Sequence, residues 1–164
     1  MTRIVAGTAG GRRLKVPPKG TRPTSERVRE ALFSSLESMM DLDGAQVLDL
    51  YAGSGALGFE ALSRGAGHAT FVESDKRAAD VLKGNAKELG FANTTIANRT
   101  AEAYVTAEGE KFDVVFADPP YAVTDDELAK VLHGLRHRLA PDAVLIVERA
   151  SRSSEPAWPE EVEH

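Results

Sequence analysis

The chain has 164 residues, a length that suits one domain with one core, and its 42% hydrophobic and 27% charged residues are ordinary for a globular protein. No apolar run reaches the length of a membrane span and no apolar signal core follows the first residues, so a cytoplasmic protein is expected. The absence of cysteine excludes disulfides, thiolate zinc sites and cysteine nucleophiles.

Charge is divided unevenly along the chain. The formal net charge is -5, yet residues 1–29 hold eight basic side chains against Glu26 alone, and the remainder is strongly acidic. Such a split is typical of a basic binding arm attached to an acidic body, although a solvated arm without a partner is the alternative. We expect residues 1–23 to be this arm and to bind nucleic acid.

The hydropathy pattern predicts elements from the amino terminus onward. Residues 3–6 and 13–16 alternate polar and apolar side chains around glycines, which favours a small hairpin. Thr24 and Ser25 are suited to cap a helix that runs to about Met39. The inward stripe of this helix is expected to consist of Val28, Ala31, Leu32, Ser35, Leu36 and Met39. Arg29, beside the stripe, is a candidate to pair with a carboxylate inside the fold. Farther along, strands are expected at 46–50, 69–73, 94–97, 112–117 and 143–148, and helices at about 56–64, 75–89, 101–107 and 125–139.

Apolar strands that alternate with amphipathic helices indicate an α/β fold. The expected sheet is doubly wound, mostly parallel and covered by helices on both faces, as in Rossmann-like proteins. We assign residues 24–150 to this domain. Residues 151–164 are acidic and contain two prolines, so they are interpreted as a tail or loop.

A glycine loop follows the strand at 46–50. Gly53, Gly55 and Gly58 form G-x-G-x-x-G between a strand and a helix, the pattern that lets a ligand approach the backbone. Glu73 ends the next strand, about where a carboxylate that holds ribose hydroxyls is found. Asp49, at the end of the strand before the loop, would repel a pyrophosphate but suits a cationic ligand. This charge argument favours S-adenosylmethionine over a nicotinamide dinucleotide; a tight turn without a ligand is the third alternative.

A second motif, Asp118-Pro119-Pro120-Tyr121, follows the strand at 112–117. In an open parallel sheet it faces the same crevice as the glycine loop. The amine of a nucleobase is a weak nucleophile, and the Asp118 carboxylate with the Pro119 carbonyl can accept its two hydrogens and aim its lone pair. The prolines fix the loop, and Tyr121 offers a flat face for the base. A plain Asp-Pro turn is the structural alternative.

With these motifs the chain resembles the bacterial 16S ribosomal RNA guanine-N2 methyltransferases, class I enzymes that use S-adenosylmethionine. The more specific similarity lies in residues 3–7, 11–14 and 22–33, because the glycine loop and Asp-Pro-Pro-Tyr occur in many amino-methylating enzymes. The resemblance implies methylation of one guanine of 16S rRNA, in an assembling small subunit. The candidate base-holding residues are Asp118, Pro119, Pro120 and Tyr121, and the candidate cofactor-binding residues are Asp49, Tyr51, Ala52, Gly53, Ser54, Gly55, Glu73, Ser74, Ala101 and Glu102.

The sequence departs from the family pattern at two places. Thr100 stands where an acidic residue usually precedes Ala101, and Glu102 is the candidate substitute. The strands that normally close the sheet at its carboxyl end are expected to be missing or truncated, since only 16 residues follow Glu148.

The RNA contacts are expected on the basic arm. Arginine heads pair with phosphate and stack on bases, and Arg12, Arg13, Arg22 and Arg27 are the candidates. No metal site is expected: His133 and His137 are four residues apart, but a solvated helix face accounts for them better. An adenine-N6 DNA methyltransferase, a nicotinamide-dependent oxidoreductase and a non-catalytic RNA-binding module are the alternatives.

Overall fold

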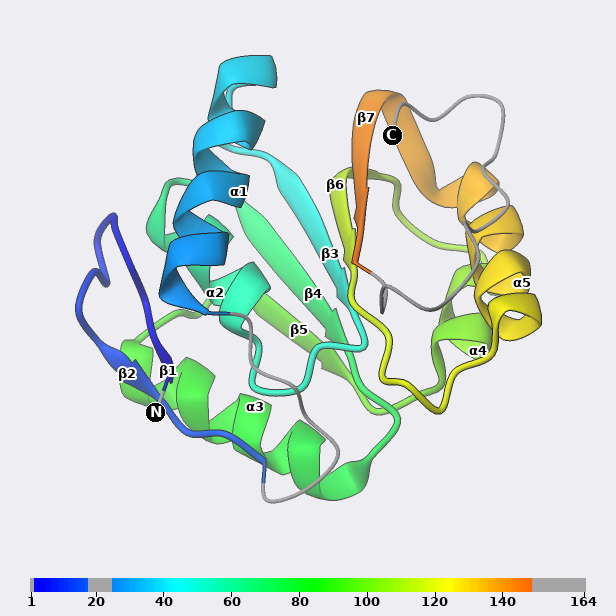
Figure 1. The fold of residues 1–164 in the computed structure, drawn as a ribbon, viewed down its shortest axis with the longest axis horizontal. Helices are drawn as coiled ribbons and strands as arrows, with labels where there is room; N and C mark the ends of the chain where they lie inside the picture. The colour runs from blue at the N-terminus through cyan, green and yellow to red at the C-terminus, as the bar shows by residue number, and fades with distance from the viewer. Residues whose placement is uncertain (1, 18–24, 149–164) are drawn as a thin grey trace.

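A five-stranded parallel sheet is the centre of the computed structural model, which describes residues 2–17 and 25–148 (Figure 1). Its strand order is β5-β4-β3-β6-β7. Because β3 pairs with β4 on one side and with β6 on the other, the strand order reverses beside β3, the place where open α/β sheets bind ligands. The strands are β3 (Gln46–Leu50), β4 (His68–Val72), β5 (Thr94–Ala97), β6 (Phe112–Ala117) and β7 (Leu139–Val147).

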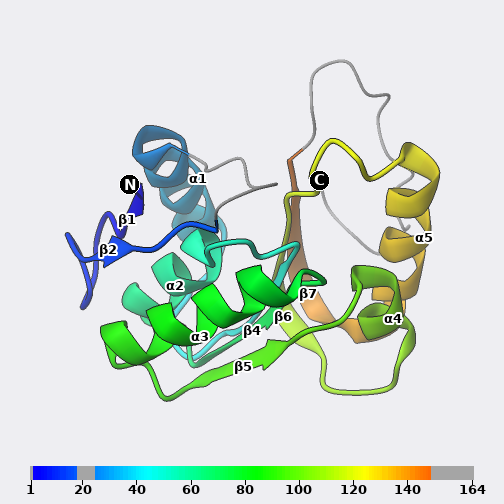
Figure 2. The same ribbon diagram turned by 90° about the horizontal axis from the view of Figure 1, so that it is seen from below.

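Helices cover both faces of the sheet. The helices α1 (Glu26–Met39), α2 (Ala56–Ser63) and α3 (Lys76–Leu89) lie on one face, and α4 (Ala101–Thr106) and α5 (Asp125–Leu135) lie on the other (Figure 2). Alternate strand residues point to opposite faces, so Val47 packs in the core under α1 and α2, and Leu48 packs in the core under α4 and α5. This explains why the strands are apolar without alternation.

Local sequence sets where the helices begin. Ser25, Asp75, Thr100 and Thr124 each cap a helix, and each side chain accepts a hydrogen bond from a backbone N–H in the first turn. Of the two cap candidates before α1, Ser25 is the one that the structure uses. Gly90 ends α3 with a left-handed conformation, φ 75°.

The amino-terminal segment, residues 2–17, packs on the helices rather than projecting from them. Its antiparallel strands are β1 (Thr2–Arg3) and β2 (Arg13–Leu14), which confirms the expected small hairpin. The buried carboxylate of Glu60, on α2, accepts the backbone N–H groups of Val5 (2.8 Å) and Ala6 (3.1 Å). Burial of Ile4 and Leu14 in the core makes this segment part of the domain.

The end of α5 differs from the expected helix at 125–139. The helix stops at Leu135, a short 3-10 turn (η1, Arg136–Arg138) follows, and β7 begins at Leu139, four residues before the strand expected at 143. Arg138 explains the change. Its buried guanidinium lies over the ring of Tyr104 and donates to the backbone carbonyls of Tyr104 in α4 and of Ala107 and Glu110 in the segment that follows α4. These tertiary contacts outweigh the helical periodicity of the sequence.

The stripe expected on α1 is also partly wrong. Val28 and Met39 are 46% and 57% exposed, whereas Arg29 is fully buried and donates to the backbone carbonyl of Arg3. The expected carboxylate partner of Arg29 is thus replaced by this carbonyl as its hydrogen-bond acceptor. Burial lowers the pKa of Arg29, and the nearby Glu60 carboxylate opposes that effect.

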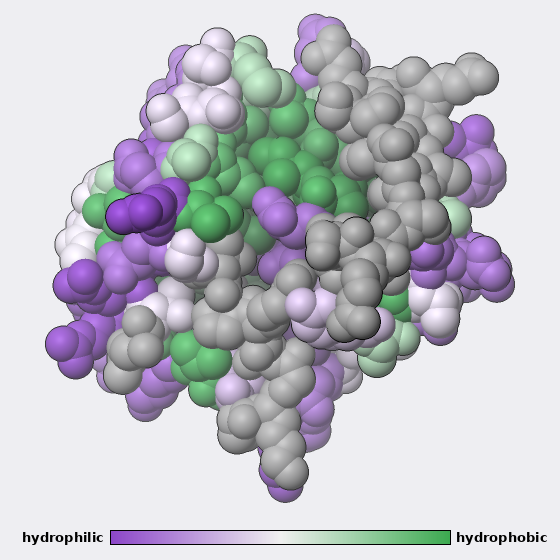
Figure 3. Space-filling view, in the orientation of Figure 1, coloured by the Kyte–Doolittle hydropathy of each residue, from purple (hydrophilic) through white to green (hydrophobic). Residues whose placement is uncertain are grey.

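The described part of the chain confirms the α/β class and the parallel sheet. No helix within residues 2–17 and 25–148 is long and apolar enough to cross a membrane. Figure 3 shows a hydrophobic surface beside α1. Met40, after α1, and Ile146, in β7, pack against the core on this side of the sheet and remain partly exposed. β7 is an edge of the described sheet. The expected tail at 151–164 and any further strands lie outside the described residues, as does Arg22.

Candidate active site

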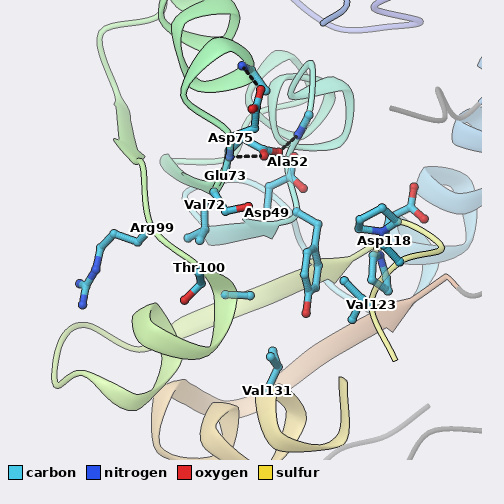
Figure 4. A pocket seen from close by; sticks show the side chains of 18 of the residues that line it. Asp49, Ala52, Val72, Glu73, Asp75, Arg99, Thr100, Asp118, Val123 and Val131 are labelled. Atoms are coloured by element: carbon cyan, nitrogen blue, oxygen red, sulfur yellow. Dashed lines mark hydrogen bonds between the residues drawn. The ribbon is translucent and has the colours of Figure 1, made fainter. Parts of the chain in front are cut away.

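A cavity of about 1040 Å³ opens at the carboxyl ends of β3, β4 and β6 (Figure 4). Both sequence motifs reach it, because parallel strands end at the same edge of the sheet. Of the candidates for the base and the cofactor, those that line the cavity are Asp49, Tyr51, Ala52, Gly53, Ser54, Glu73, Ser74, Ala101, Glu102, Asp118, Pro119 and Pro120. The remaining two, Gly55 and Tyr121, are not part of the lining.

The glycine loop joins β3 to α2 through left-handed backbone. Tyr51, Gly53 and Gly55 have φ values of 58°, 58° and 84°. Only glycine adopts this region without cost, so Tyr51 holds a strained conformation at the rim of the cavity. Gly55 serves packing: a Cβ there would lie 2.5 Å from the ring of Phe59. This explains why Gly55 belongs to the motif without lining the cavity.

Glu73 holds the glycine loop in place. Its carboxylate accepts the backbone N–H of Gly53 at 2.8 Å and that of Asp75 at 2.9 Å, and it remains partly exposed to the cavity. One carboxylate thus fixes the turn after β3 to the turn after β4. The expectation that Glu73 binds ribose hydroxyls is a proposal, and the structure adds this second role, for which the sequence held no signal.

Asp49 is a buried acid at the floor of the cavity. It is 2% exposed and accepts the backbone N–H of Gly58, in the first turn of α2, at 3.0 Å. Burial raises the pKa of Asp49 well above its usual value, the Gly58 hydrogen bond lowers it, and the negative charges of Asp118 and Glu73 raise it further. The cavity therefore concentrates negative charge, and a cation bound there would relieve the repulsion among these acids.

Asp118 and the prolines enter from the end of β6. Glu73 lies on the β4 side of the cavity and Asp118 on the β6 side (Figure 4). Pro119 is buried, while Asp118 is partly buried. Tyr121, the expected stacking surface, is 69% exposed and lies next to the lined region in sequence.

The start of α4 lines the cavity as well, beside the glycine loop and the Asp118 segment. Thr100 caps this helix by accepting the N–H of Ala103 at 3.1 Å, and Thr100, Ala101 and Glu102 all line the cavity. The hydroxyl that replaces the family's usual acid therefore has a structural role as a helix cap. Arg99 also belongs to the lining, but its side chain extends away from the other labelled residues (Figure 4).

Sequence reasoning missed several lining residues. Val16, just after β2, is the missed residue that lies farthest along the sequence from the two motifs. The others include Asp75 and Arg77 at the start of α3, and Val123, Glu127 and Val131 before and within α5. Asp75 could have been found as the first residue of the helix predicted at 75–89, two residues after the predicted strand. Val16 and Val131 carried no local signal, because only the tertiary fold brings them to the cavity.

The candidate RNA-binding arginines lie at different places. Arg12 donates to the backbone carbonyl of Glu88 at 2.7 Å, near the end of α3 that is distant from the cavity. Arg77 lines the cavity at the other end of α3, roughly 16 Å along the helix axis at about 1.5 Å per residue. Arg13 and Arg27 are exposed.

Within residues 2–17 and 25–148, no group of three potential metal-binding side chains is found.

Comparisons with known proteins identify the family. Residues 2–164 match the family described as Conserved hypothetical protein 95. The ribosomal RNA small subunit methyltransferase D of Escherichia coli K12 is 43% identical over 120 residues, which cover 73% of this chain and 60% of that protein. Its namesake from Haemophilus influenzae Rd is 40% identical over 151 residues, 89% of this chain and 77% of that protein. The chain thus spans less than two thirds of the Escherichia coli relative.

Solved structures agree with this relationship. The yhhF protein of Escherichia coli superposes with a TM-score of 0.85 at 36% identity and covers 96% of this chain and 85% of its own. Protein TTHA0928 of Thermus thermophilus has a TM-score of 0.80 at 34% identity and covers 90% and 85%. The chain therefore belongs to the family described as Conserved hypothetical protein 95 and is a relative of the ribosomal RNA small subunit methyltransferase D proteins, which confirms the resemblance seen in its sequence.

Proposed function

We propose that this chain binds S-adenosylmethionine in the cavity and methylates the exocyclic N2 amine of a guanine in 16S rRNA of the small ribosomal subunit. The observation that carries the proposal is the meeting of the glycine loop, Glu73 and Asp118-Pro119-Pro120 in one cavity. The names of the relatives at 40% and 43% identity support ribosomal RNA as the substrate.

The acids of the cavity favour S-adenosylmethionine over a dinucleotide. When bound, S-adenosylmethionine supplies an electrophilic methyl group on a positively charged sulfur. The negative charges of Glu73 and Asp118 act on the buried Asp49 carboxyl, and a cation bound among these three acids is stabilised by them. A pyrophosphate needs the free N–H groups at the start of the helix, but the Gly58 N–H in the first turn of α2 is already bound by the Asp49 carboxylate. One of the donors that a pyrophosphate would use is therefore already occupied, which disfavours the nicotinamide alternative.

The chain's own groups act mainly by positioning. In this proposal the Asp118 carboxylate and the Pro119 carbonyl accept the two amine hydrogens and orient the nitrogen lone pair toward the methyl group. Pro119 and Pro120 lack backbone N–H groups and restrict the loop, which keeps these acceptors in place. Glu73 fixes the glycine loop and accepts hydrogen bonds from the ribose. Most of the rate enhancement then comes from alignment, because the methyl donor leaves as a neutral thioether.

In this proposal RNA is bound by the basic amino-terminal segment, residues 2–17, and by α1. The body of the protein is acidic, so phosphate contacts require cations on its surface. Arg13 and Arg27 are exposed, and Arg13 directly precedes the stretch that brings Val16 to the cavity. Arg12 is less favourable for contacts near the target base, since its guanidinium binds the distant end of α3. Asp118-Pro119-Pro120 alone permits adenine as well as guanine, and the resemblance of residues 3–7, 11–14 and 22–33 to the guanine-N2 enzymes favours guanine.

The decisive experiment is incubation of the protein with unmethylated small subunits and S-adenosylmethionine labelled in its methyl group, followed by nucleoside analysis. We expect label in N2-methylguanosine of 16S rRNA. Calorimetric titration with S-adenosylmethionine and with NADH is the control for the cofactor. Label in N6-methyladenosine, or binding of NADH alone, would replace the proposal with one of its alternatives.

A further inference from the structure

Asn85, on α3, joins the glycine loop to the amino-terminal segment through a buried amide. It is 2% exposed and does not line the cavity. Its Nδ2 donates to the backbone carbonyl of Ser54 at 3.0 Å and to that of Lys15 at 3.0 Å, and its Oδ1 accepts the backbone N–H of Lys15 at 2.9 Å. Two segments far apart in the sequence, at Lys15 and at Ser54, are thus held by one side chain of α3.

Both ends of this connection lie beside functional surfaces. Ser54 is part of the glycine loop that lines the cavity, and Val16, which follows Lys15, lines the same cavity. On the other side of Lys15, Arg13 is an exposed cation of the segment proposed to contact RNA. The Asn85 amide is therefore a hydrogen-bonded link between the glycine loop and the segment that contains Lys15.

The geometry requires asparagine rather than a generic polar group. An amide offers one acceptor and two donor hydrogens, and all three are used here, by the Lys15 N–H, the Lys15 carbonyl and the Ser54 carbonyl. Aspartate keeps the acceptor and loses both donations, while leucine keeps the volume and loses all three bonds. Because the site is buried, an unmatched partner there is costly, which makes the three bonds mutually dependent.

We propose that Asn85 is a positioning residue that couples occupancy of the cofactor cavity to the order of residues 13–17, and so to RNA affinity. This proposal rests on the proposed function for the identity of the two ligands. A ligand that fixes the glycine loop strengthens the Asn85–Ser54 bond and thereby holds the Lys15 segment, and by reciprocity RNA bound to that segment strengthens cofactor binding.

The test measures amide hydrogen exchange of the full chain with and without S-adenosylhomocysteine. We expect the peptide covering residues 13–17 to exchange about 3- to 10-fold more slowly when the ligand is bound, the range that corresponds to one intramolecular hydrogen bond. In Asn85→Leu this ligand-induced protection should disappear while S-adenosylhomocysteine still binds. Asn93→Ala is the matched control, because Asn93 also donates to a distant loop carbonyl, that of Gly67, away from the cavity.

The outcomes separate this inference from the proposed function. If the wild-type chain fails to bind S-adenosylhomocysteine, the cofactor assignment fails first. If it binds the ligand but residues 13–17 exchange at an unchanged rate, the coupling is overturned and the methyltransferase proposal stands. Should Asn85→Leu not fold, Asn85→Asp tests the same loss of donors, and the wild-type comparison alone remains decisive. Fluorescence anisotropy with a 16S rRNA fragment should show a parallel gain in affinity of about 3- to 10-fold when the ligand is bound, a gain that Asn85→Leu lacks.

Discussion

Asp49 provides a prediction that links stability to ligand binding. Its carboxyl is buried beside Asp118 and Glu73, and its pKa is raised well above the usual value of 3.8. A folded-state pKa above the unfolded-state pKa means that the folded protein holds this proton more tightly. Below about pH 4 both states are protonated and Asp49 has no effect. As the pH rises above that value, stability falls until the folded-state pKa is passed, and the loss then stays constant.

Replacing Asp49 with asparagine should remove this loss. Asparagine carries no charge but keeps a side-chain oxygen that can accept the Gly58 N–H, which Asp49 accepts at 3.0 Å. Between about pH 4 and the folded-state pKa, the gain in the free energy of unfolding should therefore grow by about 1.4 kcal/mol for each pH unit, or roughly 3–6 °C in Tm per pH unit for a domain of this size. The same substitution should weaken binding of the cationic cofactor, since asparagine has no carboxyl that can ionise beside the cation.

Thermal unfolding of both proteins between pH 4 and pH 8 tests this reasoning, with calorimetric titration of S-adenosylmethionine at pH 8. The stability difference should be small at pH 4 and grow toward pH 8. Asp113→Asn is the matched control: Asp113 accepts the N–H of Gln46 at 2.8 Å, at the edge of the sheet opposite the cavity. A variant of Asp49 that is less stable at every pH, by a constant amount, would refute the argument.

Three further variants address the chemistry. Asp118→Ala should lower the methylation rate by at least ~100-fold with cofactor affinity within a few-fold, and near-normal turnover would remove Asp118 from the mechanism. Glu73→Gln exchanges an acceptor of the Gly53 N–H for an amide and should weaken cofactor binding by about 1.5–3 kcal/mol, measured by titration; an unchanged affinity would contradict its role. The double change of Arg13 and Arg27 to alanine should lower the salt slope of RNA binding by about 0.7–0.9 per lost phosphate contact, whereas an unchanged slope places recognition elsewhere.

Much of the sheet and the cavity could be predicted because the signals are local. β3, β5 and β6 have the predicted bounds, since each is a short β-forming segment between turn residues, and β3 and β6 are also largely apolar. The glycine loop and Asp118-Pro119-Pro120 follow two of these strands. Parallel pairing brings strand ends together whatever the details of the helices, so the meeting of the motifs at one edge followed from the fold class.

The parts that could not be predicted depend on single side chains acting across the fold. Arg138 ends α5 early because its guanidinium finds three backbone carbonyls near α4. Arg29 is buried although arginine is normally exposed, and the sequence pattern placed Val28 inward instead. No sequence motif marks Asn85, because its hydrogen-bond partners Lys15 and Ser54 are 70 and 31 residues away.

The amino-terminal segment shows why charge alone is an incomplete description of a binding region. Its excess of cations suggested an arm that could be altered independently of the body. In the structure, backbone groups of the segment satisfy Glu60 and Asn85, two buried polar side chains of α2 and α3. Removing the segment would leave these groups buried without partners, which is costly, whereas replacing exposed arginines such as Arg13 leaves every one of these backbone bonds intact. Side-chain variants therefore separate RNA binding from folding and cofactor binding, and truncation cannot.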